Sequence, residues 1–292
     1  MNARLGSYLA LAALAATGVV ASCMATRGQA PSESASITTG SGEALRVEQP
    51  DDATTRAAEQ PAAPDAGTDS AADQTAAADA AAFYTATEPP KAPQVYTVAA
   101  IGDSLTDERS YPKTYVAALR AACPKSRFDN YGVGGNMVNQ MRRRFVREVF
   151  APGRPAYTHV IVFGGINDIY SDETAKRTPA KITADLSEMY REASARGARV
   201  VALTIAPWAG FKRWYNPSRA AATHEVNRFI REALPNGQVD AVIDTGVLLS
   251  CGDPERLCDD LSAPFKDGLH FGAAGHARLA ETLKTAVFSG CE

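Results

Sequence analysis

The sequence predicts an α/β domain over residues 94–292, in which a five-stranded parallel sheet carries helices on both faces. Three observations predict this fold. The apolar runs are short, continuous and rich in Val and Ile, as in strands that are covered on both faces. Stretches with helical signals alternate with them, which favours parallel strands joined by crossover helices. Polar motifs follow several of the runs, at the edge where parallel sheets bind their ligands.

The strands are expected from the apolar runs themselves, in chain order at 95–101, 128–131, 159–163, 200–205 and 239–243. The helices are expected in the stretches between and after them, at 112–122, 138–150, 179–196, 218–234 and 273–288. Pro112 and Pro179 suit the first turn of a helix, where a missing N–H costs nothing. Gly197 suits the position just after a helix end.

The first 22 residues (1–22) predict a secretory signal peptide rather than a membrane span. Arg4 and the free amino group give a positive start, and the apolar stretch 5–20 is too short to cross a bilayer. Val20-Ala-Ser-Cys23 resembles the lipobox of bacterial lipoproteins, which implies that Cys23 is lipidated and anchors the chain to the outer membrane or cell surface. The alternative is ordinary cleavage nearby, for instance after Ala25, which would leave a soluble secreted or periplasmic protein.

Residues 23–93 are expected to form a disordered tail ahead of the folded domain. The segment is rich in Ala, Pro, Asp and Thr and has few large apolar residues, so it cannot bury enough surface to offset the entropy of ordering. Positions 24–93 hold eleven Asp/Glu and four Arg/Lys, whereas 94–292 hold 22 Asp/Glu and 25 Arg/Lys. Neither balance suggests the concentrated basic face of a nucleic-acid-binding protein.

Four cysteines follow Cys23, and export to an oxidising compartment would let them pair. Three connectivities are possible. We expect Cys251–Cys258, which lie in one Gly/Pro/Asp-rich loop, and Cys123–Cys291, which follow the first and last helices of the domain. The C-termini of crossover helices meet at the edge opposite the ligand-binding edge, which favours the second pair. The alternative is that these cysteines are free buried thiols.

A candidate nucleophile stands directly after the first predicted strand, in Gly102-Asp-Ser-Leu105. A serine hydroxyl is nearly inert at its ordinary pKa and needs an adjacent base. On a turn between strand and helix, Ser104 would expose its oxygen and aim local backbone N–H groups at a substrate. The motif lacks the second glycine of the G-x-S-x-G elbow. A phosphate-positioning or capping turn is the alternative for this motif on its own.

Asp267 and His270 supply the second half of this chemistry, just before the last predicted helix. At this spacing the carboxylate can accept a hydrogen bond from one ring nitrogen while the other ring nitrogen faces Ser104. The carboxylate would fix the tautomer of the ring and stabilise the imidazolium that forms when Ser104 loses its proton. The alternative for the pair on its own is a helix-capping Asp beside a solvent-facing His.

Two polar stretches between these motifs offer donors for an oxyanion hole. Gly135 would let a backbone N–H approach a developing anion, and Gly134 is the alternative one position earlier. Asn167 would donate from its uncharged side-chain amide. Asp103 and Asp168 are expected to hold loops together rather than to touch the substrate.

In order and context, Ser104, Gly135, Asn167 and His270 resemble the four sequence blocks of the SGNH/GDSL hydrolase superfamily. The match covers essentially the whole of the predicted domain. The resemblance implies a flavodoxin-like, three-layer α/β/α domain with a triad of Ser104, His270 and Asp267. It also implies three oxyanion donors, from the backbones of Ser104 and Gly135 and the side chain of Asn167, with no metal and no cofactor.

The sequence departs from the pattern of this superfamily at two places. Phe271 follows His270 where proline is frequent, and this change leaves the candidate base in place. The second block reads Gly-Val-Gly-Gly-Asn rather than the commoner Gly-Ile-Ser-Gly-Thr, which leaves open whether Gly134 or Gly135 is the donor.

The segment after the fourth predicted strand is rich in aromatic residues and should overhang the cleft. Trp208 and Trp214 could stack on sugars or wall an acyl pocket. The alternative is that they pin a long loop to its own domain. Arg142 to Arg144 could attract anionic polymers, although the solvated face of a helix is the simpler interpretation.

Together the motifs favour an extracytoplasmic serine esterase that hydrolyses short acyl esters through an acyl-enzyme on Ser104, above all O-acetyl esters on polysaccharide. The expected partners are such a small ester or acylated polysaccharide and a membrane reached through Cys23, with no nucleic acid. The rival enzymes are a lysophospholipase or thioesterase and a sugar O-acyltransferase. The rival of a different class is a non-catalytic glycan-binding lipoprotein, which would have no need for Asp-x-x-His beside a serine.

Overall fold

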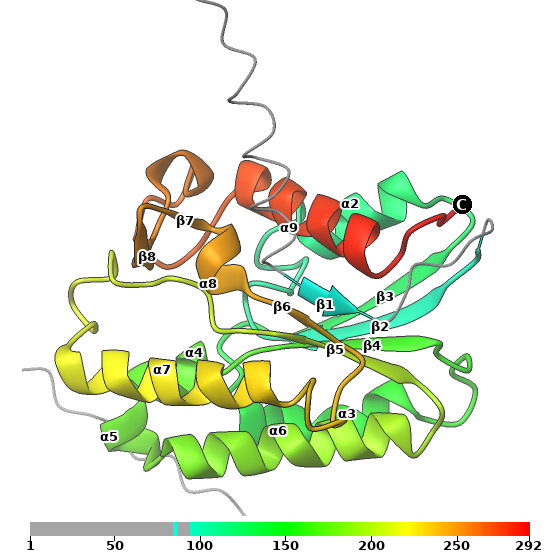
Figure 1. Ribbon diagram of the computed structural model, residues 1–292, viewed down its shortest axis with the longest axis horizontal. Coiled ribbons are helices and arrows are strands. Elements are labelled where there is room, and N and C mark those ends of the chain that lie inside the picture. The colour runs from blue at the N-terminus through cyan, green and yellow to red at the C-terminus, as the bar shows by residue number, and fades with distance from the viewer. Residues whose placement is uncertain (1–83, 87–93) are drawn as a thin grey trace, which may run out of the picture. The chain divides into compact units, whose positions relative to one another are not determined.

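A computed structural model of the chain describes residues 84–86 and 94–292 (Figure 1). The expected signal peptide (1–22), the lipid anchor at Cys23 and nearly all of the expected tail (23–93) lie outside the described residues. No helix in the described part is both long and apolar enough to cross a membrane.

The domain is built on a sheet of five parallel strands with one antiparallel strand at its edge (Figure 1). Across the sheet the order is β1-β6-β5-β4-β2-β3. The parallel strands therefore follow the flavodoxin-like order 2-1-3-4-5, counted along the chain, as the resemblance implied. The strands are β1 (Tyr84–Ala86), β2 (Thr97–Gly102), β3 (Arg127–Gly132), β4 (His159–Phe163), β5 (Arg199–Leu203) and β6 (Ala241–Ile243).

Strand β1 lies within the segment 23–93 that we expected to be disordered, most of which lies outside the described residues. Its residues pair antiparallel with Ala241–Ile243 of β6. Without this strand, β6 would leave a row of unpaired N–H and C=O groups at the edge of the sheet. Pairing of this kind uses main-chain groups, so three residues can join the sheet without the apolar run that marked the other strands.

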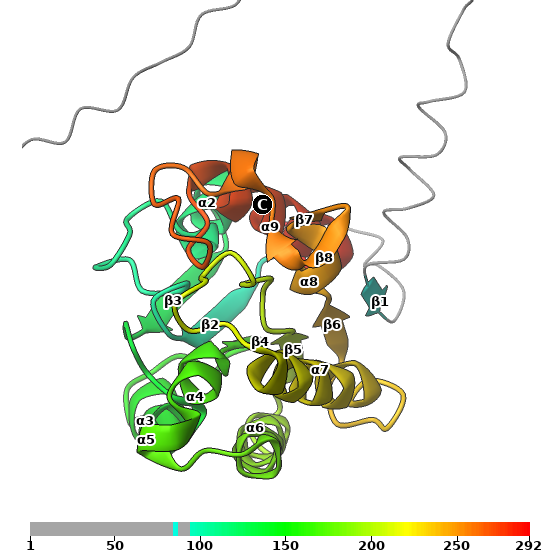
Figure 2. The ribbon, with the colours of Figure 1, turned by 90° about the vertical axis from the view of Figure 1, so that its left-hand side faces the viewer.

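Two layers of helices cover the two faces of the sheet (Figure 1, Figure 2). One face carries α2 (Tyr115–Ala122) and α9 (Ala273–Ala286), and the other carries α3 (Val138–Val149), α6 (Pro179–Ser194) and α7 (Pro217–Glu232). Successive residues of β2 point to opposite faces, so Ala99 and Ile101 join one hydrophobic core while Val98 and Ala100 join the other. Both faces of the strand are buried, which is why its apolar run is continuous.

The helix that follows β2 begins later than the sequence predicted, at Tyr115 instead of Pro112. Thr114 is its N-cap, and the Thr114 side chain accepts a hydrogen bond from the Ala117 N–H. Several short elements that the sequence did not indicate lie in the loops after β4 and β6. They are α4 (Ile166–Tyr170), α5 (Asp172–Ala175), α8 (Thr245–Leu248), β7 (Ser250–Cys251), β8 (Asp253–Leu257) and the 3-10 helix η1 (Asp259–Leu261).

Both expected disulfide bonds are present. Cys123–Cys291 joins the end of α2 to the segment after α9, with Cα atoms 5.3 Å apart. Beside it, Gln94 and Cys291 form a short parallel bridge, so the two ends of the continuous stretch 94–292 meet. Cys251–Cys258 closes the β7–β8 hairpin, with Cα atoms 5.0 Å apart.

Candidate active site

Ser104 and His270 meet at the carboxyl edge of the sheet, although 166 positions separate them. The Ser104 Oγ lies 3.0 Å from the His270 Nε2. Strand β2 ends at Gly102, and a Cβ there would come within 2.2 Å of the Thr106 Oγ1 and 2.7 Å of the Phe163 carbonyl oxygen. Only glycine therefore lets the chain turn this tightly out of the sheet and present Ser104.

Asp267 orients the imidazole of His270. The Asp267 Oδ2 lies 2.7 Å from the His270 Nδ1, while its Oδ1 accepts the backbone N–H groups of Leu269 and His270. Burial opposes ionisation of Asp267, but these hydrogen bonds outweigh it and hold the pKa of the carboxyl below its ordinary value. A carboxylate at Nδ1 keeps the proton on that nitrogen, which leaves Nε2 as an acceptor facing Ser104.

The loop that carries Asp267 and His270 leans against the loop that follows β5. Gly268 has a φ of +80°, and a Cβ on it would lie 2.0 Å from the Gly210 carbonyl carbon. Both the backbone conformation and the close approach thus require glycine between the carboxylate and the imidazole.

The structure separates the two candidate glycine donors. The Gly134 N–H donates to the Asp107 Oδ2 at 2.9 Å. Among the described residues, the N–H groups of Gly135 and Ser104 have no hydrogen-bond partner. Gly135 has a φ of +77° and is exposed. The geometry therefore favours Gly135 over Gly134 as the donor that could meet a developing anion.

Asp107 fixes this glycine turn, a role that the sequence did not indicate. Besides the Gly134 N–H, its carboxylate accepts hydrogen bonds from the Arg109 side chain and backbone and from the Ser110 hydroxyl. Burial opposes ionisation, yet these donors lower the pKa of Asp107 to about 2. The carboxylate is therefore charged at neutral pH and binds the turn to the segment that follows Ser104.

Asn167 is buried, and its amide is oriented by three contacts. Its Oδ1 accepts a hydrogen bond from the Tyr170 hydroxyl at 2.6 Å. The Nδ2 end donates to the Asp103 Oδ2 at 3.2 Å and to the Asn136 carbonyl oxygen at 3.1 Å. Burial raises the pKa of Asp103 to about 6. These contacts confirm that Asp103 ties loops together.

Arg144 corrects the interpretation of the arginine cluster on α3 as a solvated face. The residue is 7% exposed, and its side chain donates to the Gly102 carbonyl oxygen at 3.1 Å and to the Asn136 Oδ1 at 2.8 Å. The guanidinium therefore joins the turn that carries Ser104 to the turn that carries Gly135. Arg142, in contrast, pairs with Asp185 and Glu188 on the neighbouring helix.

The two tryptophans expected to contact substrate differ in exposure. Trp208 is 1% exposed, and its indole N–H donates to the Thr223 Oγ1 at 3.1 Å. Its burial favours the alternative that it pins the loop to the domain. Trp214 is half-buried, and its ring lies 6.2 Å from that of Tyr170, the residue that orients Asn167. Substrate contact by Trp214 stays a prediction.

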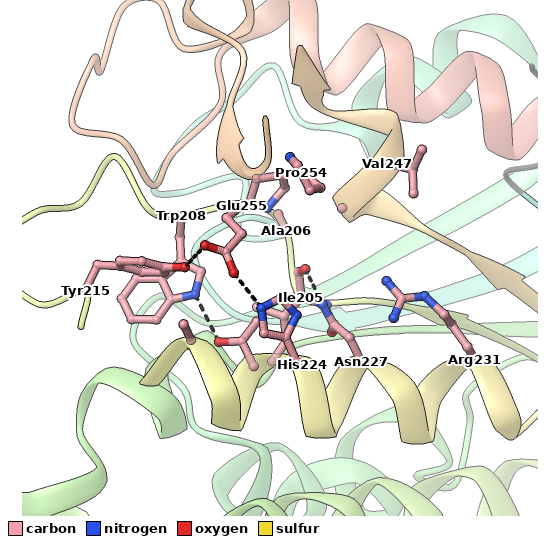
Figure 3. A pocket seen from close by; sticks show the side chains of 14 residues that line it. Ile205, Ala206, Trp208, Tyr215, His224, Asn227, Arg231, Val247, Pro254 and Glu255 are labelled. Carbon is pink, nitrogen blue, oxygen red and sulfur yellow. Dashed lines mark hydrogen bonds and ion pairs between the residues drawn. The ribbon is translucent and has the colours of Figure 1, made fainter. Parts of the chain in front are cut away.

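A cavity of about 220 Å³ lies beside the Trp208 loop, between α7 and β8, and Ser104, Asp267 and His270 do not line it (Figure 3). Glu255 reaches across it and accepts hydrogen bonds from the Tyr215 hydroxyl at 2.6 Å and from the His224 Nε2 at 2.5 Å. These two bonds lower the pKa of Glu255. The carboxylate is thus already satisfied by protein groups, and its bonds tie α7 to the β7–β8 hairpin.

His276, on α9, is buried and caps a helix on the same face. Its Nδ1 accepts the backbone N–H of Tyr115, the first residue of α2, at 3.1 Å. Burial lowers the pKa of His276 to about 3, so the ring is neutral at physiological pH. Within the described residues, no group of three or more His, Cys, Asp or Glu side chains could hold a metal ion.

Asp107 and Tyr170 are the site residues that sequence reasoning missed. Asp107 lies three positions after Ser104, and Tyr170 lies three positions after Asn167 on the short helix α4. A spacing of three places two side chains on one side of a helical turn, so this signal could have identified Tyr170. The bond from Asp107 to Gly134 joins two loops, and the sequence carries no local signal for it.

The sequence model of the GDSL-like lipase/acylhydrolase family matches residues 100–278, more than half of the chain. No curated protein matches the chain. Among solved structures, the chain is similar to a GDSL-like lipase from Bacteroides thetaiotaomicron, at 18% identity and a TM-score of 0.52 over 74% of this chain and 96% of that one. It is also similar to an acetylxylan esterase from Geobacillus stearothermophilus, at 21% identity and a TM-score of 0.54 over 70% of this chain and 99% of that one. At these identities the likeness shows a shared fold.

Proposed function

The chain belongs to the GDSL-like lipase/acylhydrolase family and is a hydrolase of carboxylic esters, and from this premise we propose that it removes short acyl groups, above all O-acetyl groups, from polysaccharide outside the cytoplasm. The observation that carries the proposal is the unbroken contact path from Asp267 through His270 to Ser104. A serine beside an oriented imidazole is the arrangement that acyl transfer through a covalent intermediate requires.

In the proposed reaction, the Ser104 Oγ attacks the ester carbonyl carbon while His270 Nε2 takes the hydroxyl proton. Asp267 stabilises the imidazolium that forms. The tetrahedral intermediate expels the alcohol, which receives the proton from His270, and the acyl group stays on Ser104. Water then attacks the acyl-enzyme with His270 as the base, which releases the carboxylic acid and restores the serine.

The oxyanion of the intermediate would be held by the backbone N–H groups of Ser104 and Gly135 and by the Asn167 amide. The two N–H groups are free of protein partners in the described part of the chain, which supports this assignment. The Asn167 amide already donates to Asp103 and Asn136 over 3.1–3.2 Å, so it must exchange or share one of these long bonds with the substrate. Catalytic hydrogen bonds often tighten only when substrate is bound.

Two observations support the acyl group and the compartment that we propose. A solved structure with the same fold is described as an acetylxylan esterase, an enzyme of acetyl esters on a polysaccharide. Two disulfide bonds in one domain are typical of exported proteins. The anchor at Cys23 rests on the sequence pattern at positions 20–23.

A fluorophosphonate probe tests the proposal directly. We expect one covalent adduct, located on Ser104 by peptide mass spectrometry, with labelling lost in Ser104→Ala and retained in Ser218→Ala, which removes an exposed serine on α7. We further expect faster turnover of p-nitrophenyl acetate than of p-nitrophenyl octanoate. Folded protein without an adduct on Ser104 would favour the non-catalytic glycan-binding protein. Faster turnover of octanoate would favour a lysophospholipase or thioesterase.

A further inference from the structure

Two aromatic rings that neither the motifs nor the proposed triad include lie beside the candidate base. The Phe265 ring centroid is 5.4 Å from that of His270, and the Tyr111 ring is 5.2 Å from Phe265 in an edge-to-face arrangement. Phe265 is 37% exposed, which leaves part of its ring open to a ligand.

Contacts of its ring and its backbone hold Tyr111 in place and leave its hydroxyl available to a ligand. It lies on the segment between Ser104 and α2, where its ring stacks on the buried His276 at 5.5 Å and its backbone N–H donates to the Asp107 carbonyl oxygen. Its hydroxyl has no hydrogen-bond partner among the described residues. Tyr111 therefore offers an apolar ring edge and a free hydroxyl at one place.

The chemistry of the reaction decides which part of an ester these rings would meet. The alcohol leaves with the proton that His270 carries, so its oxygen must lie within about 3 Å of Nε2 as the bond breaks. Groups on that oxygen must then lie on the His270 side of the site. The Phe265 ring lies beside the His270 ring and Tyr111 lies beside Phe265, whereas the proposed donors Asn167 and Gly135 would surround the carbonyl oxygen.

We propose that Tyr111 and Phe265 form a subsite for the alcohol part of the ester, and that this subsite takes a sugar ring. The proposal rests on the proposed esterase function and extends it to the leaving group. An exposed flat ring suits the C–H face of a pyranose, and the Tyr111 hydroxyl can bond to one of its hydroxyls. Lys113 and Lys266, both exposed, lie two positions after Tyr111 and one position after Phe265, so charged groups border this part of the chain, which a sugar tolerates better than a long hydrocarbon chain does.

The test compares two acetyl esters that differ only in the alcohol. One is an acetylated xylooligosaccharide, and the other is ethyl acetate, whose alcohol is too small to reach the rings; p-nitrophenyl esters are avoided because their own ring could stack on Phe265. For Phe265→Ala we expect kcat/KM on the oligosaccharide to fall about tenfold, mainly through KM, with ethyl acetate changed less than about twofold. Phe265→Trp, which keeps a flat ring, should retain most of the activity.

Two further variants complete the test. Tyr111→Phe keeps the ring and removes the hydroxyl, so we expect a loss of about threefold on the oligosaccharide alone. Val146→Ala, which truncates an apolar residue of matching exposure on α3 (38%), should change neither rate. If Phe265→Ala does not fold, as judged by circular dichroism, Phe265→Leu gives the same readout without a flat ring.

The outcomes separate this subsite from the esterase function. An equal loss on both esters, or a loss in kcat alone, would overturn the subsite while leaving the esterase in place. Wild-type protein that hydrolyses ethyl acetate but not the oligosaccharide would overturn the sugar as its ligand. Wild-type protein that hydrolyses neither ester would overturn the proposed function and the subsite together.

Discussion

The nucleophile turn, residues 102–107, and the acid–base loop, residues 249–272, meet at the contact between Ser104 and His270, but they are held by different forces. The nucleophile turn continues directly from the central strand β2 and is mostly buried. Its Asp103 carbonyl oxygen accepts the N–H groups of Thr106 and Asp107, and Arg144 holds the Gly102 carbonyl oxygen. The sheet itself thus sets the position of the serine.

The acid–base loop has no such support from the sheet. A disulfide bond between Cys251 and Cys258 closes its hairpin, and backbone bonds such as Cys258 N–H to the Leu249 carbonyl oxygen and Gly272 N–H to the Leu261 carbonyl oxygen hold the loop together. The side chains of Asp267 and His270 are 34% and 28% exposed. The difference teaches that the sheet positions the nucleophile, whereas the base is positioned by individual bonds within its loop, each of which can be removed by substitution.

Among the variants that test this difference, Asp267→Asn should have the largest effect on catalysis. The Oδ1 of the new side chain can still accept the backbone N–H groups of Leu269 and His270, which turns its amide N–H₂ toward His270 Nδ1. That donor forces the other tautomer, with a proton on Nε2 facing Ser104. We expect kcat to fall about 10³–10⁴-fold, while the free energy of unfolding changes by about 1 kcal/mol or less.

Steady-state kinetics and urea unfolding at pH 7.5 measure both quantities. Asp259→Asn is the matched control, because Asp259 lies on the same loop with its side chain 83% exposed. A small loss of kcat with a large loss of stability would show that Asp267 supports the loop and does not orient the base.

Removing one disulfide bond should mainly lower stability, whereas removing the other should mainly lower catalysis. The Cys123–Cys291 bond spans 168 positions and the Cys251–Cys258 bond spans seven. Loop-closure entropy therefore predicts losses of about 5 and about 2.5 kcal/mol of unfolding free energy. We expect the Cys123→Ala/Cys291→Ala variant to be the less stable of the two but to keep its kcat, since that bond lies away from the site.

The Cys251→Ala/Cys258→Ala variant should show the reverse, with kcat/KM lowered about tenfold because the loop that carries the base is less well fixed. Thermal unfolding and kinetics at 20 °C, where both variants are folded, give the two readings. Unchanged kcat/KM in this second variant would show that the loop keeps the base in place without its hairpin bond.

The smallest effect concerns His276, which lies just after the acid–base loop and caps α2, the helix that follows the nucleophile turn. Its folded pKa is about 3 and its ordinary value is 6.5. The unfolded chain therefore takes up a proton as pH falls below 6.5 while the folded chain does not, so stability is complete above pH 6.5 and is lost toward pH 3. The slope is up to about 1.4 kcal/mol per pH unit.

His276→Asn keeps an acceptor near the Nδ1 position and removes the titration. Urea unfolding at several pH values between 6.5 and 4 should give a shallower loss of stability for this variant than for the wild type. An unchanged slope would assign the acid sensitivity to another group, and His159, whose pKa burial lowers to about 4, is the next candidate.

Much of the fold could be predicted because buried parallel strands have an unmistakable sequence pattern. The runs at 159–163 and 200–205 are apolar on both faces, and the structure places β4 and β5 there within two residues. Ser104, Asn167 and His270 could be predicted as a group because they lie in loops at one edge of the sheet. Strand β1 could not be predicted, because its pairing with β6 depends on the unpaired edge of the sheet and not on a pattern in its own residues.

One supporting contact of the site could not be predicted for a different reason, whereas another could. Asp107 and Gly134 are 27 positions apart, and their contact exists only once two loops have been placed. Arg144 did carry a signal: it lies three positions after Met141 and one before Phe145, both fully buried, so it borders the apolar stripe of α3. An arginine at such a position is better interpreted as a buried contact than as a solvated charge.

The bridge between Gln94 and Cys291 has a consequence for how this domain could be carried by other chains. The Gln94 N–H donates to the Gly290 carbonyl oxygen at 2.8 Å, and the Glu292 N–H donates to the Gln94 carbonyl oxygen at 3.2 Å. The two ends of the continuous stretch 94–292 therefore lie side by side, before the amino end of β2 and away from Ser104. A circular permutant of residues 94–292, which leaves out the edge strand β1, could join them with a short linker, and a host protein could carry this stretch in a surface loop, without cutting a parallel strand or covering the catalytic edge.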